Sequence, residues 1–464
     1  MLERGQLKQR AGLGDAFILG EVSYKQVGPS AGGPRRGGVM IFHQLKQILL
    51  VSLLLASGIC SAAPGDFDSS FNRLGFTRDS IAGSTAGECV AIHPSGEIVT
   101  SGRYGDFGSE RLVLWRHLPD GTLDKAFGDG GVIFPPSPVD VAAADSLAID
   151  QLDRIVLIAT TSTSYVAHRF NFDGSSDLSF GGTGILSIPI EGGPFPIAGV
   201  AIDAENRILG VGGSYGSRSR FIVYRVQETG ELDPSFGGTG IVFTEMTSGP
   251  ADRATGVALQ PDGKIVVAGR AGSPLNYLVA LARYLPDGVL DPEFGSEGKL
   301  VFSVLDSNLG RKVVIQPDGK IAVAFSACLN PGPDVHCSPG LARLGDRGAL
   351  DPMFGDGGWT YVDLGGFGAY AYDLALQPDG AIVTAGDRFI TPDSNNTTAL
   401  LLRFLPDGSL DDTFGFHGIS ETTYGYTYNI AGSIRLQADG RIVIAGFTGG
   451  AMSGGAVTAR YLAK

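Results

Sequence analysis

The chain has 464 residues and a formal net charge of −13, and 70 of its residues are glycine. This acidic balance argues against nucleic acid as a partner, because phosphate binding requires clustered basic charge. Glycine is about twice as frequent as its usual ~7%. Because most glycines recur at fixed places in a repeat, they indicate turns rather than a low-complexity chain.

The segment 40–63 has the features of a secretory signal peptide. Lys46 precedes an apolar stretch, Ile48–Cys60, which is too short to span a membrane and is followed by small residues. We predict cleavage near Ala62 or Ala63. A buried core helix is the alternative interpretation.

The residues on either side of this segment differ in character. Residues 1–39 carry Arg and Gly clusters without the later repeat pattern, and Met40 stands where a signal peptide would start. We therefore interpret 1–39 as a non-native upstream extension. Residues 1–63 contain seven Lys or Arg and three Asp or Glu, so 28 basic and 45 acidic residues remain. We expect 64–464 to be one acidic exported domain, periplasmic or extracellular, with no membrane span after cleavage.

One pattern repeats through this domain: an Arg is followed eight residues later by an Asp, eleven later by a Phe and fifteen later by a Gly. The six complete copies have Arg, Asp and Phe at Arg116, Asp124, Phe127; Arg169, Asp177, Phe180; Arg225, Asp233, Phe236; Arg283, Asp291, Phe294; Arg343, Asp351, Phe354; and Arg403, Asp411, Phe414. Arg460 has only four residues after it, and its missing partners stand at the start of the domain as Asp68, Phe71 and Gly75. The two ends are therefore halves of one repeat, which predicts a closed ring rather than a linear array.

Each repeat contains four predicted strands. Within 254–298, the apolar, β-branched runs Val257–Gln260 and Lys264–Ala268 are joined by Pro-Asp-Gly, a hairpin turn. A third run covers Tyr277–Leu285, and a fourth, Lys299–Val304, leads into the next repeat. Helical periodicity is absent. We predict an all-β fold, a seven-bladed β-propeller of four-stranded blades closed by its N- and C-terminal segments.

The repeated residues have a structural interpretation. Asp233, Asp291 and Asp351 each precede a proline, the arrangement of a helix N-cap followed by the first residue of a helical turn. Such a turn would carry the repeated Phe into the core. The repeated Arg would then hold backbone or carboxylate groups between neighbouring repeats.

Two stretches of the fourth repeat, LQPDGKIVVAG at 259–269 and LARYLPDGVLDPEFG at 281–295, resemble the delta-60 repeat, a β-propeller repeat found in exported bacterial proteins. The resemblance covers essentially residues 65–464 and is strongest in the fourth, sixth and seventh repeats. It implies the propeller fold and export. It supplies no agreed catalytic residue.

Three cysteines remain after the predicted cleavage site. Cys328 and Cys337 bracket the turn-rich sequence LNPGPDVH, which favours a local disulfide in an exported protein and leaves Cys89 as a small core residue. A metal site that uses these two thiols and His336 is the competing interpretation.

The sequence contains no recognisable catalytic constellation. The histidines of the domain occupy unrelated repeat positions, and we expect them at the surface: His93, His117, His168, His336 and His417. The Asp-Gly turns do not match a calcium-binding loop, and neither a Gly-x-Ser-x-Gly elbow nor a phosphate-binding loop occurs. We therefore predict no catalytic residue, no metal and no cofactor.

Variation between repeats indicates where binding takes place. The loops between the second and third strands of each unit emerge on one face of a propeller, and exposed aromatic and Arg residues there suit a binding surface. The candidates are Arg103, Tyr104, Tyr215, Arg218, Arg220, Arg270, Tyr277, Arg388, Phe389 and Phe447. The alternative is that these loops have merely drifted.

These observations predict a monomeric binding or scaffold module for a protein or a glycan. The alternative function is that of a propeller hydrolase or lactonase with a metal on the axis.

Overall fold

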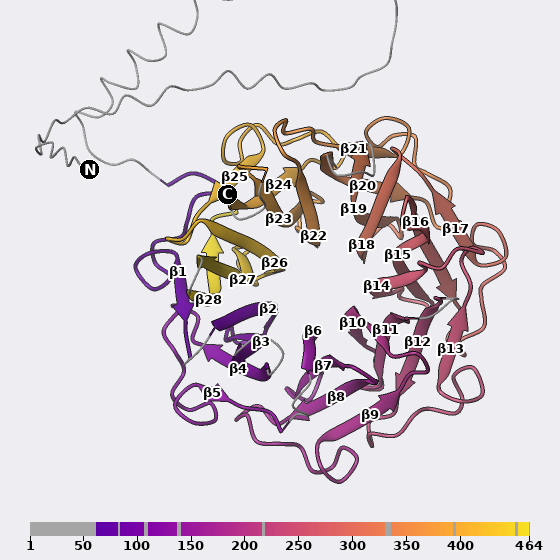
Figure 1. The fold of residues 1–464 in the computed structure, drawn as a ribbon, viewed down its shortest axis with the longest axis horizontal. Helices are drawn as coiled ribbons and strands as arrows, with labels where there is room; N and C mark the ends of the chain where they lie inside the picture. Colours follow the sequence, from indigo (N-terminus) through magenta and orange to yellow (C-terminus); the bar gives the residue numbers. More distant parts are fainter. Residues whose placement is uncertain are drawn as a thin grey trace, which may run out of the picture.

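The computed structural model describes residues 62–463 apart from 82–83, 106–109, 137–140, 216–218, 330–335, 393–395 and 451–452. Every regular element in this part of the chain is a β-strand, and the strands form seven four-stranded sheets around an axis (Figure 1). The predicted seven-bladed propeller is confirmed. Residues 1–39 and all but the last two residues of the predicted signal peptide lie outside the described residues.

The first three blades follow one another along the chain. The first contains β2 (Ser84–Ile92), β3 (Ile98–Gly105), β4 (Arg111–His117) and β5 (Val132–Ile133). The second contains β6 (Val141–Ile149), β7 (Ile155–Thr161), β8 (Ser164–Phe170) and β9 (Ile185–Pro189). The third contains β10 (Pro194–Ile202), β11 (Ile208–Ser214), β12 (Phe221–Val226) and β13 (Ile241–Thr244).

The next three blades continue the order. The fourth contains β14 (Arg253–Leu259), β15 (Ile265–Ser273), β16 (Asn276–Tyr284) and β17 (Lys299–Phe302). The fifth contains β18 (Ser307–Ile315), β19 (Ile321–Leu329), β20 (His336–Leu344) and β21 (Trp359–Tyr361). The sixth contains β22 (Ala369–Leu376), β23 (Ile382–Phe389), β24 (Thr397–Phe404) and β25 (Ile419–Thr422).

In each blade the first strand lies beside the axis and the fourth at the rim (Figure 1). The strands are antiparallel, so the connections between the first and second strands and between the third and fourth lie at one end of the blade. We call this the turn end. The connection between the second and third strands lies at the other end, which we call the loop end.

The seventh blade closes the ring. It contains β26 (Tyr428–Leu436), β27 (Ile442–Gly450), β28 (Ser453–Tyr461) and, from the start of the domain, β1 (Phe76–Asp79). β1 lies beside β28 (Figure 1). Phe76 pairs with Ala459 in this ladder, and the amide of Gly65 donates to the carbonyl of Leu462 at 2.8 Å. The predicted closure is confirmed. The outer edge of β28 is paired, so this seam offers no open strand to another chain.

The tight turns at the turn end need a residue with a left-handed backbone conformation. Gly263, in Pro-Asp-Gly, has a φ of 83°. In the second and third blades Asp153 and Asn206 take the equivalent place with φ values of 62° and 57°. Asp and Asn tolerate this conformation better than most residues. The hairpin therefore persists where the glycine is absent.

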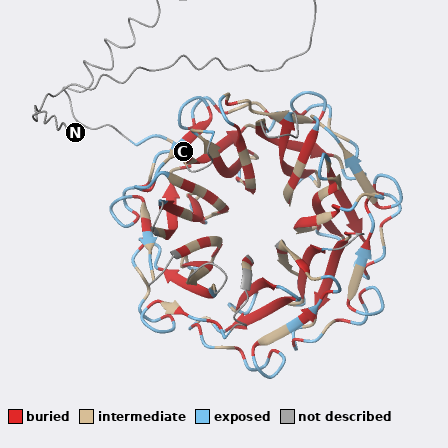
Figure 2. Cartoon of the chain, viewed as in Figure 1, coloured by how far each residue is buried: buried red, intermediate tan, exposed pale blue. Residues whose placement is uncertain are grey.

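The core lies between blades, where neighbouring sheets stack face to face (Figure 2). Every residue of β7, β8, β11 and β12 is buried, because both faces of a middle strand are covered. All seven repeated Phe side chains are completely buried. Phe236 of the third blade, for example, packs in one cluster with Val267 and Tyr284 of the fourth. These strands are accordingly rich in apolar residues, although β8 and β12 also carry the repeated arginines Arg169 and Arg225.

The repeated Asp starts a tight turn. Asp233 Oδ1 accepts a hydrogen bond from the Ser235 amide at 3.0 Å, and the Asp233 carbonyl accepts one from the Phe236 amide at 3.0 Å. Gly240, with a φ of 85°, ends the turn by donating its amide to the Phe236 carbonyl at 2.8 Å. The Asp side chain therefore caps a single turn that ends at the Gly, and the segment is too short to form a helix.

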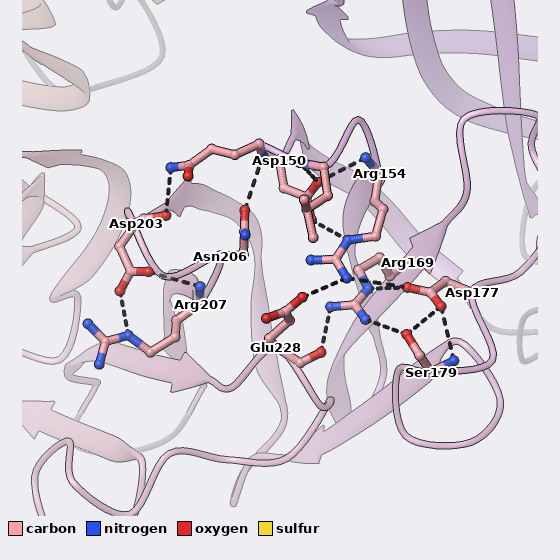
Figure 3. Close-up of polar contacts among 11 residues, drawn as sticks. Asp150, Arg154, Arg169, Asp177, Ser179, Asp203, Asn206, Arg207 and Glu228 are labelled. Atoms are coloured by element: carbon pink, nitrogen blue, oxygen red, sulfur yellow. Dashed lines mark hydrogen bonds and ion pairs between the residues drawn. The ribbon is translucent and has the colours of Figure 1, made fainter.

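The repeated Arg joins a blade to the next, and Figure 3 shows this for Arg169. Arg169 Nε donates to Asp177 Oδ2 at 2.6 Å within the second blade, and its Nη1 donates to the carbonyl of Glu228 in the third blade at 2.6 Å. The guanidinium lies over the ring of Phe180, 4.6 Å from the centroid. We call this arrangement the arginine clasp. It recurs at Arg116, Arg225, Arg283, Arg343 and Arg460.

Arg403 does not form the full arginine clasp. It belongs to the sixth blade, which meets the seventh blade at a seam where both ends of the chain lie. It pairs with Asp411 as expected, but its other donors reach Gln377 Oε1 at 2.5 Å and Asp379 Oδ2 at 2.7 Å, both within its own blade. A backbone contact still crosses the seam, because the Gly415 amide donates to the Pro64 carbonyl at 2.7 Å.

The disulfide joins two strands at the loop end of the fifth blade. Cys328 and Cys337 are direct cross-strand partners in the β19–β20 ladder and are bonded to each other. The structure thus contains the predicted pair, although both cysteines lie on strands that extend into the predicted loop. Cys89 is half-buried and packs beside the core of the first two blades.

Candidate binding site on the propeller axis

A β-bulge interrupts the first strand of every blade. The register shifts lie at Gly87/Cys89, Ala143/Ser146, Phe195/Gly199, Ala254/Gly256, Gly310/Val313, Ala371/Asp373 and Ala431/Ser433. A bulge leaves a residue outside the strand ladder and turns it away from its neighbours. At four of these sites that residue has a distinctive side chain, Glu88, Thr255, Arg311 or Tyr372, and we call these four the bulge residues.

The bulges surround a cavity of about 550 Å³ on the axis, lined by residues from all seven blades. Its charged lining residues are Glu88, Arg103, Arg311, Lys312, Asp373 and Arg435. A second cavity of about 300 Å³ lies further along the inner strands towards the turn end and is lined mainly by aliphatic residues such as Val257 and Leu374. The two cavities share Ser146, Lys312, Asp373 and Arg435.

The acidic residues of this cavity are bound to neighbouring groups. Glu88 accepts a hydrogen bond from Arg103 Nε at 2.7 Å and another from the Ala144 amide of the second blade at 2.6 Å. Asp373 accepts one from Ser433 Oγ of the seventh blade at 3.0 Å and pairs with Arg435 Nη1 at 2.9 Å. Both carboxylates join two blades. They are engaged in holding the ring together.

A buried carboxyl lies behind the bulge of the sixth blade. Asp387 on β23 is 1% exposed and accepts a hydrogen bond from the Tyr372 hydroxyl at 2.8 Å. Burial raises the pKa of Asp387 to about 6, against the lowering effect of the Tyr372 hydrogen bond and the Arg311 charge. Its second oxygen, Oδ2, is buried without a hydrogen-bond partner in the described part of the chain.

The structure places most of the predicted loop residues on strands. Tyr215 and Arg220 do lie in the β11–β12 connection, and Arg218 lies outside the described residues. The others are on β3, β15, β16, β23 and β27: Arg103, Tyr104, Arg270, Tyr277, Arg388, Phe389 and Phe447. The prediction ended the second strand too early. In the fourth blade, pairing of β15 with β16 continues to Ser273 opposite Asn276.

Several of these residues already have partners. Arg388 pairs with Glu421 at 2.6 Å and donates to the carbonyl of Leu364 at 2.8 Å. Arg220 lies over the ring of Phe243, 4.5 Å from the centroid. Tyr215 differs from them because its side chain remains 48% exposed.

Two histidines contradict the predicted surface position. His117 and His168 are each only 1% exposed, because they lie on the third strands of their blades, which neighbouring sheets cover. Burial lowers the pKa of His168 to about 4. Neither ring nitrogen of His168 has a hydrogen-bond partner among the described residues.

Sequence reasoning missed the bulge residues, although a signal for them exists. Each stands six residues before the first residue of its Pro-x-Gly turn, at a position where the chemistry changes from repeat to repeat: Glu88, Thr255, Arg311 and Tyr372. Aligning the repeats on their first turn brings these four residues into one column of the alignment. Only the structure shows that these positions converge on one cavity.

The repeat itself matches a known family. Residues 93–127, 206–236, 260–294 and 377–414 match the family described as "Domain of unknown function (DUF5122) beta-propeller". The chain belongs to this delta-60 repeat propeller family. No curated protein matches this chain at a significant level.

Solved structures resemble the chain at low identity. A catalytically inactive virginiamycin B lyase from Staphylococcus aureus with quinupristin is 11% identical, with a TM-score of 0.47 over 82% of this chain and 98% of that one. Sqt1 from Chaetomium thermophilum, bound to the N-terminus of a ribosomal protein, is 13% identical, with a TM-score of 0.43 over 83% and 100%. The polysaccharide lyase Uly1 is 11% identical, with a TM-score of 0.40 over 74% and 93%. Such likeness concerns the fold alone.

Within the described ranges, the delta-60 propeller has no helix long and apolar enough to cross a membrane. The same ranges hold no group of three or more His, Cys, Asp or Glu residues placed to bind a metal ion.

Proposed function

We propose that this delta-60 propeller is an exported binding module that holds its ligand at the loop end of the ring, in and around the axial cavity. One observation carries the proposal. The blades share their residues at the turn end, whereas the bulge residues that line the common cavity differ from blade to blade. Residues that maintain the ring must repeat, and residues that recognise a ligand are free to vary.

The cavity has a size and a lining that suit a binding site. Its volume of about 550 Å³ lies within the usual range of ligand pockets, ~300–1,000 Å³. Its walls combine apolar surface, hydroxyl groups such as those of Thr255 and Ser433, and charged side chains. A glycan unit or a polar peptide segment would find both contact area and hydrogen-bonding groups here. The Cys328–Cys337 disulfide is compatible with an oxidising compartment, which supports export.

A matched pair of substitutions tests the proposal. Ala86 lines the axial cavity, and Ala86→Trp would fill it without changing charge. Ala438 is exposed at the turn end, and Ala438→Trp is the control for the added side chain. Labelled full-length protein and both variants would be applied to arrays of glycans and peptides. We expect the cavity variant to lose the ligands of the parent and the control to keep them. Equal binding by all three proteins would contradict an axial site.

A further inference from the structure

Three arginines converge at the loop end of the fourth and fifth blades. Arg253 on β14 and Arg270 on β15 are direct cross-strand partners, and Arg311 stands in the bulge of β18 on the next blade. The blades approach closely at this point, because a Cβ on Gly310 would overlap the carbonyl oxygen of Gly269. Arg311 and Arg270, the residues that follow these glycines, are thereby brought into electrostatic contact.

Aromatic rings hold the three guanidinium groups in place. The guanidinium carbons lie over ring centroids at 3.1 Å for Arg253 and Phe195, 4.2 Å for Arg270 and Tyr277, and 5.2 Å for Arg311 and Tyr372. Stacking on a ring uses the flat face of a guanidinium and leaves its N–H groups free to form hydrogen bonds in the plane. The cluster is therefore oriented while its donors remain available.

In the part of the chain that the structure describes, no carboxylate pairs with this cluster. Among the described residues, none of the three arginines forms a hydrogen bond or ion pair with an acidic side chain, and the Nε atoms of Arg253 and Arg311 are buried without a partner. Asp387 acts on Arg311 only at longer range, and the Asp387 Oδ1 atom is occupied by the Tyr372 hydroxyl. Burial and the neighbouring charges of Arg253 and Arg311 lower the pKa of Arg270 to about 10.

Like charges held together destabilise a sheet unless another group compensates them. At the turn end a buried arginine is paired with a carboxylate. Arg283 Nε, for example, donates to Asp291 Oδ2 at 2.9 Å. At the loop end the equivalent counter-charge is absent from the described residues. An external anion would supply it, with oxygens that match the guanidinium donors in pairs.

We propose that Arg253, Arg270 and Arg311 form an anion site for an acidic saccharide, a ligand that carries carboxylate or sulfate groups on sugar rings. This inference rests on the proposed binding function and names its ligand class. The saccharide is favoured over an acidic peptide because the half-exposed ring of Tyr215 lies beside Arg253, 5.7 Å from its guanidinium carbon. A flat aromatic face next to a guanidinium fits a sugar ring that bears an acidic group.

The test measures binding of defined probes to the full-length protein by calorimetry. The probes are a trigalacturonate, a sulfated disaccharide, a neutral trisaccharide of similar size and oligoglutamate. The variants are Arg253→Gln, Arg270→Gln and Arg311→Gln, with Arg347→Gln as the control. Arg347 is exposed at the turn end, so its replacement makes the same change of net charge away from the site.

We expect at least one acidic saccharide to bind and the neutral one to bind at least about tenfold more weakly. Each site variant should weaken acidic binding by about tenfold or more, as expected for the loss of a charge-assisted bidentate contact. Arg270→Lys should retain part of the affinity, because it keeps the charge but not the planar fork. The control should bind like the parent.

Two results would overturn the inference: no acidic saccharide bound at millimolar concentration, or Arg270→Gln and Arg347→Gln binding alike. Tighter binding of oligoglutamate than of every acidic saccharide would overturn the ligand class. The axial cavity is judged separately with Ala86→Trp. If that variant binds array ligands like the parent while the arginine variants lose the acidic saccharide, the anion site stands and the axial-cavity function fails.

Discussion

Arg283 and Arg270 belong to the same blade but to opposite ends of it. At the turn end, Arg283 is 1% exposed, pairs with Asp291 at 2.9 Å and donates to a carbonyl of the next blade. At the loop end, Arg270 lies over Tyr277 beside two further arginines, with no acidic partner among the described residues. At the turn end the arginine finds its partners inside the protein, so replacing it should lower the free energy of unfolding. The loop end leaves donors unused, and changes there should affect binding.

The largest expected effect comes from breaking a clasp. Arg283→Ala takes away the guanidinium partner of buried Asp291, which keeps only Lys264 at 3.5 Å, and should lower the free energy of unfolding by ~3–5 kcal/mol. Phe294→Ala should cost a similar ~3–5 kcal/mol because it opens a cavity in the core. Arg270→Ala should not lower the free energy of unfolding, because it removes one of the like charges held together with Arg253 and Arg311. Urea unfolding measures all three. Similar losses for Arg283→Ala and Arg270→Ala would remove the distinction between the two ends.

Asp387 and Asp291 should give the two ends opposite pH responses. A raised pKa in the folded protein means that ionisation disfavours folding, so Asp387 lowers stability as pH rises from about 4 through about 6. Asp387→Asn should therefore stabilise the protein at pH 7.5 by about 3 kcal/mol and have no effect at pH 3.5. Unfolding measured across this pH range checks the sign.

Asp291 is the control, because its effect on stability should change with pH in the opposite direction from that of Asp387. Burial raises the pKa of Asp291, but the Glu293 amide hydrogen bond and the charges of Arg283 and Lys264 outweigh it, and the net pKa is lowered. Its stabilisation is present at neutral pH and is lost as pH falls through its folded pKa. Asp291→Asn should therefore destabilise the protein at pH 7.5. The same sign for both variants would contradict the assigned environments.

The disulfide marks one part of the loop end that does contribute to stability. Cys328 and Cys337 close a loop with a sequence separation of 9. Replacing both by Ser should cost about 2.5 kcal/mol through the larger conformational entropy of the unfolded chain. Mass spectrometry of the purified protein should find these two sulfur atoms bonded to each other. Free thiols at both positions in the parent, with no loss of stability in the double variant, would show that this hairpin does not contribute to stability.

His168 lies in the middle of a blade and tests a smaller effect. Its folded pKa of about 4 is below the ordinary value of 6.5, so stability present above pH 6.5 is lost as pH falls towards 4. Leu402 occupies the equivalent repeat position in the sixth blade and is fully buried. His168→Leu should therefore remove about 2 kcal/mol of acid destabilisation at pH 5. An unchanged pH profile would show that the ring is not neutral and buried in solution.

Local chemistry, repeated seven times, is what could be predicted from the sequence. The pairing of Arg460 with Asp68 at 2.8 Å across the ring closure follows from a spacing that only a circular arrangement completes. The burial of Phe71 and its counterparts likewise follows from one turn whose geometry is set within a few residues. The Cys328–Cys337 pair belongs to a single hairpin. Each of these features needs only neighbouring residues or a strict period.

The candidate site could not be predicted in this way, because its parts come from different blades. Arg311 reaches Arg270 only because Gly310 packs against the backbone of the preceding blade, and Tyr372 faces the axis only because a bulge removes it from the ladder. His168 is buried by sheets distant in sequence. The sequence by itself determined the repeat, the turns and the closure of the ring. The convergence of unlike side chains on the axis was decided by the curvature and stacking of the blades, which no single repeat encodes.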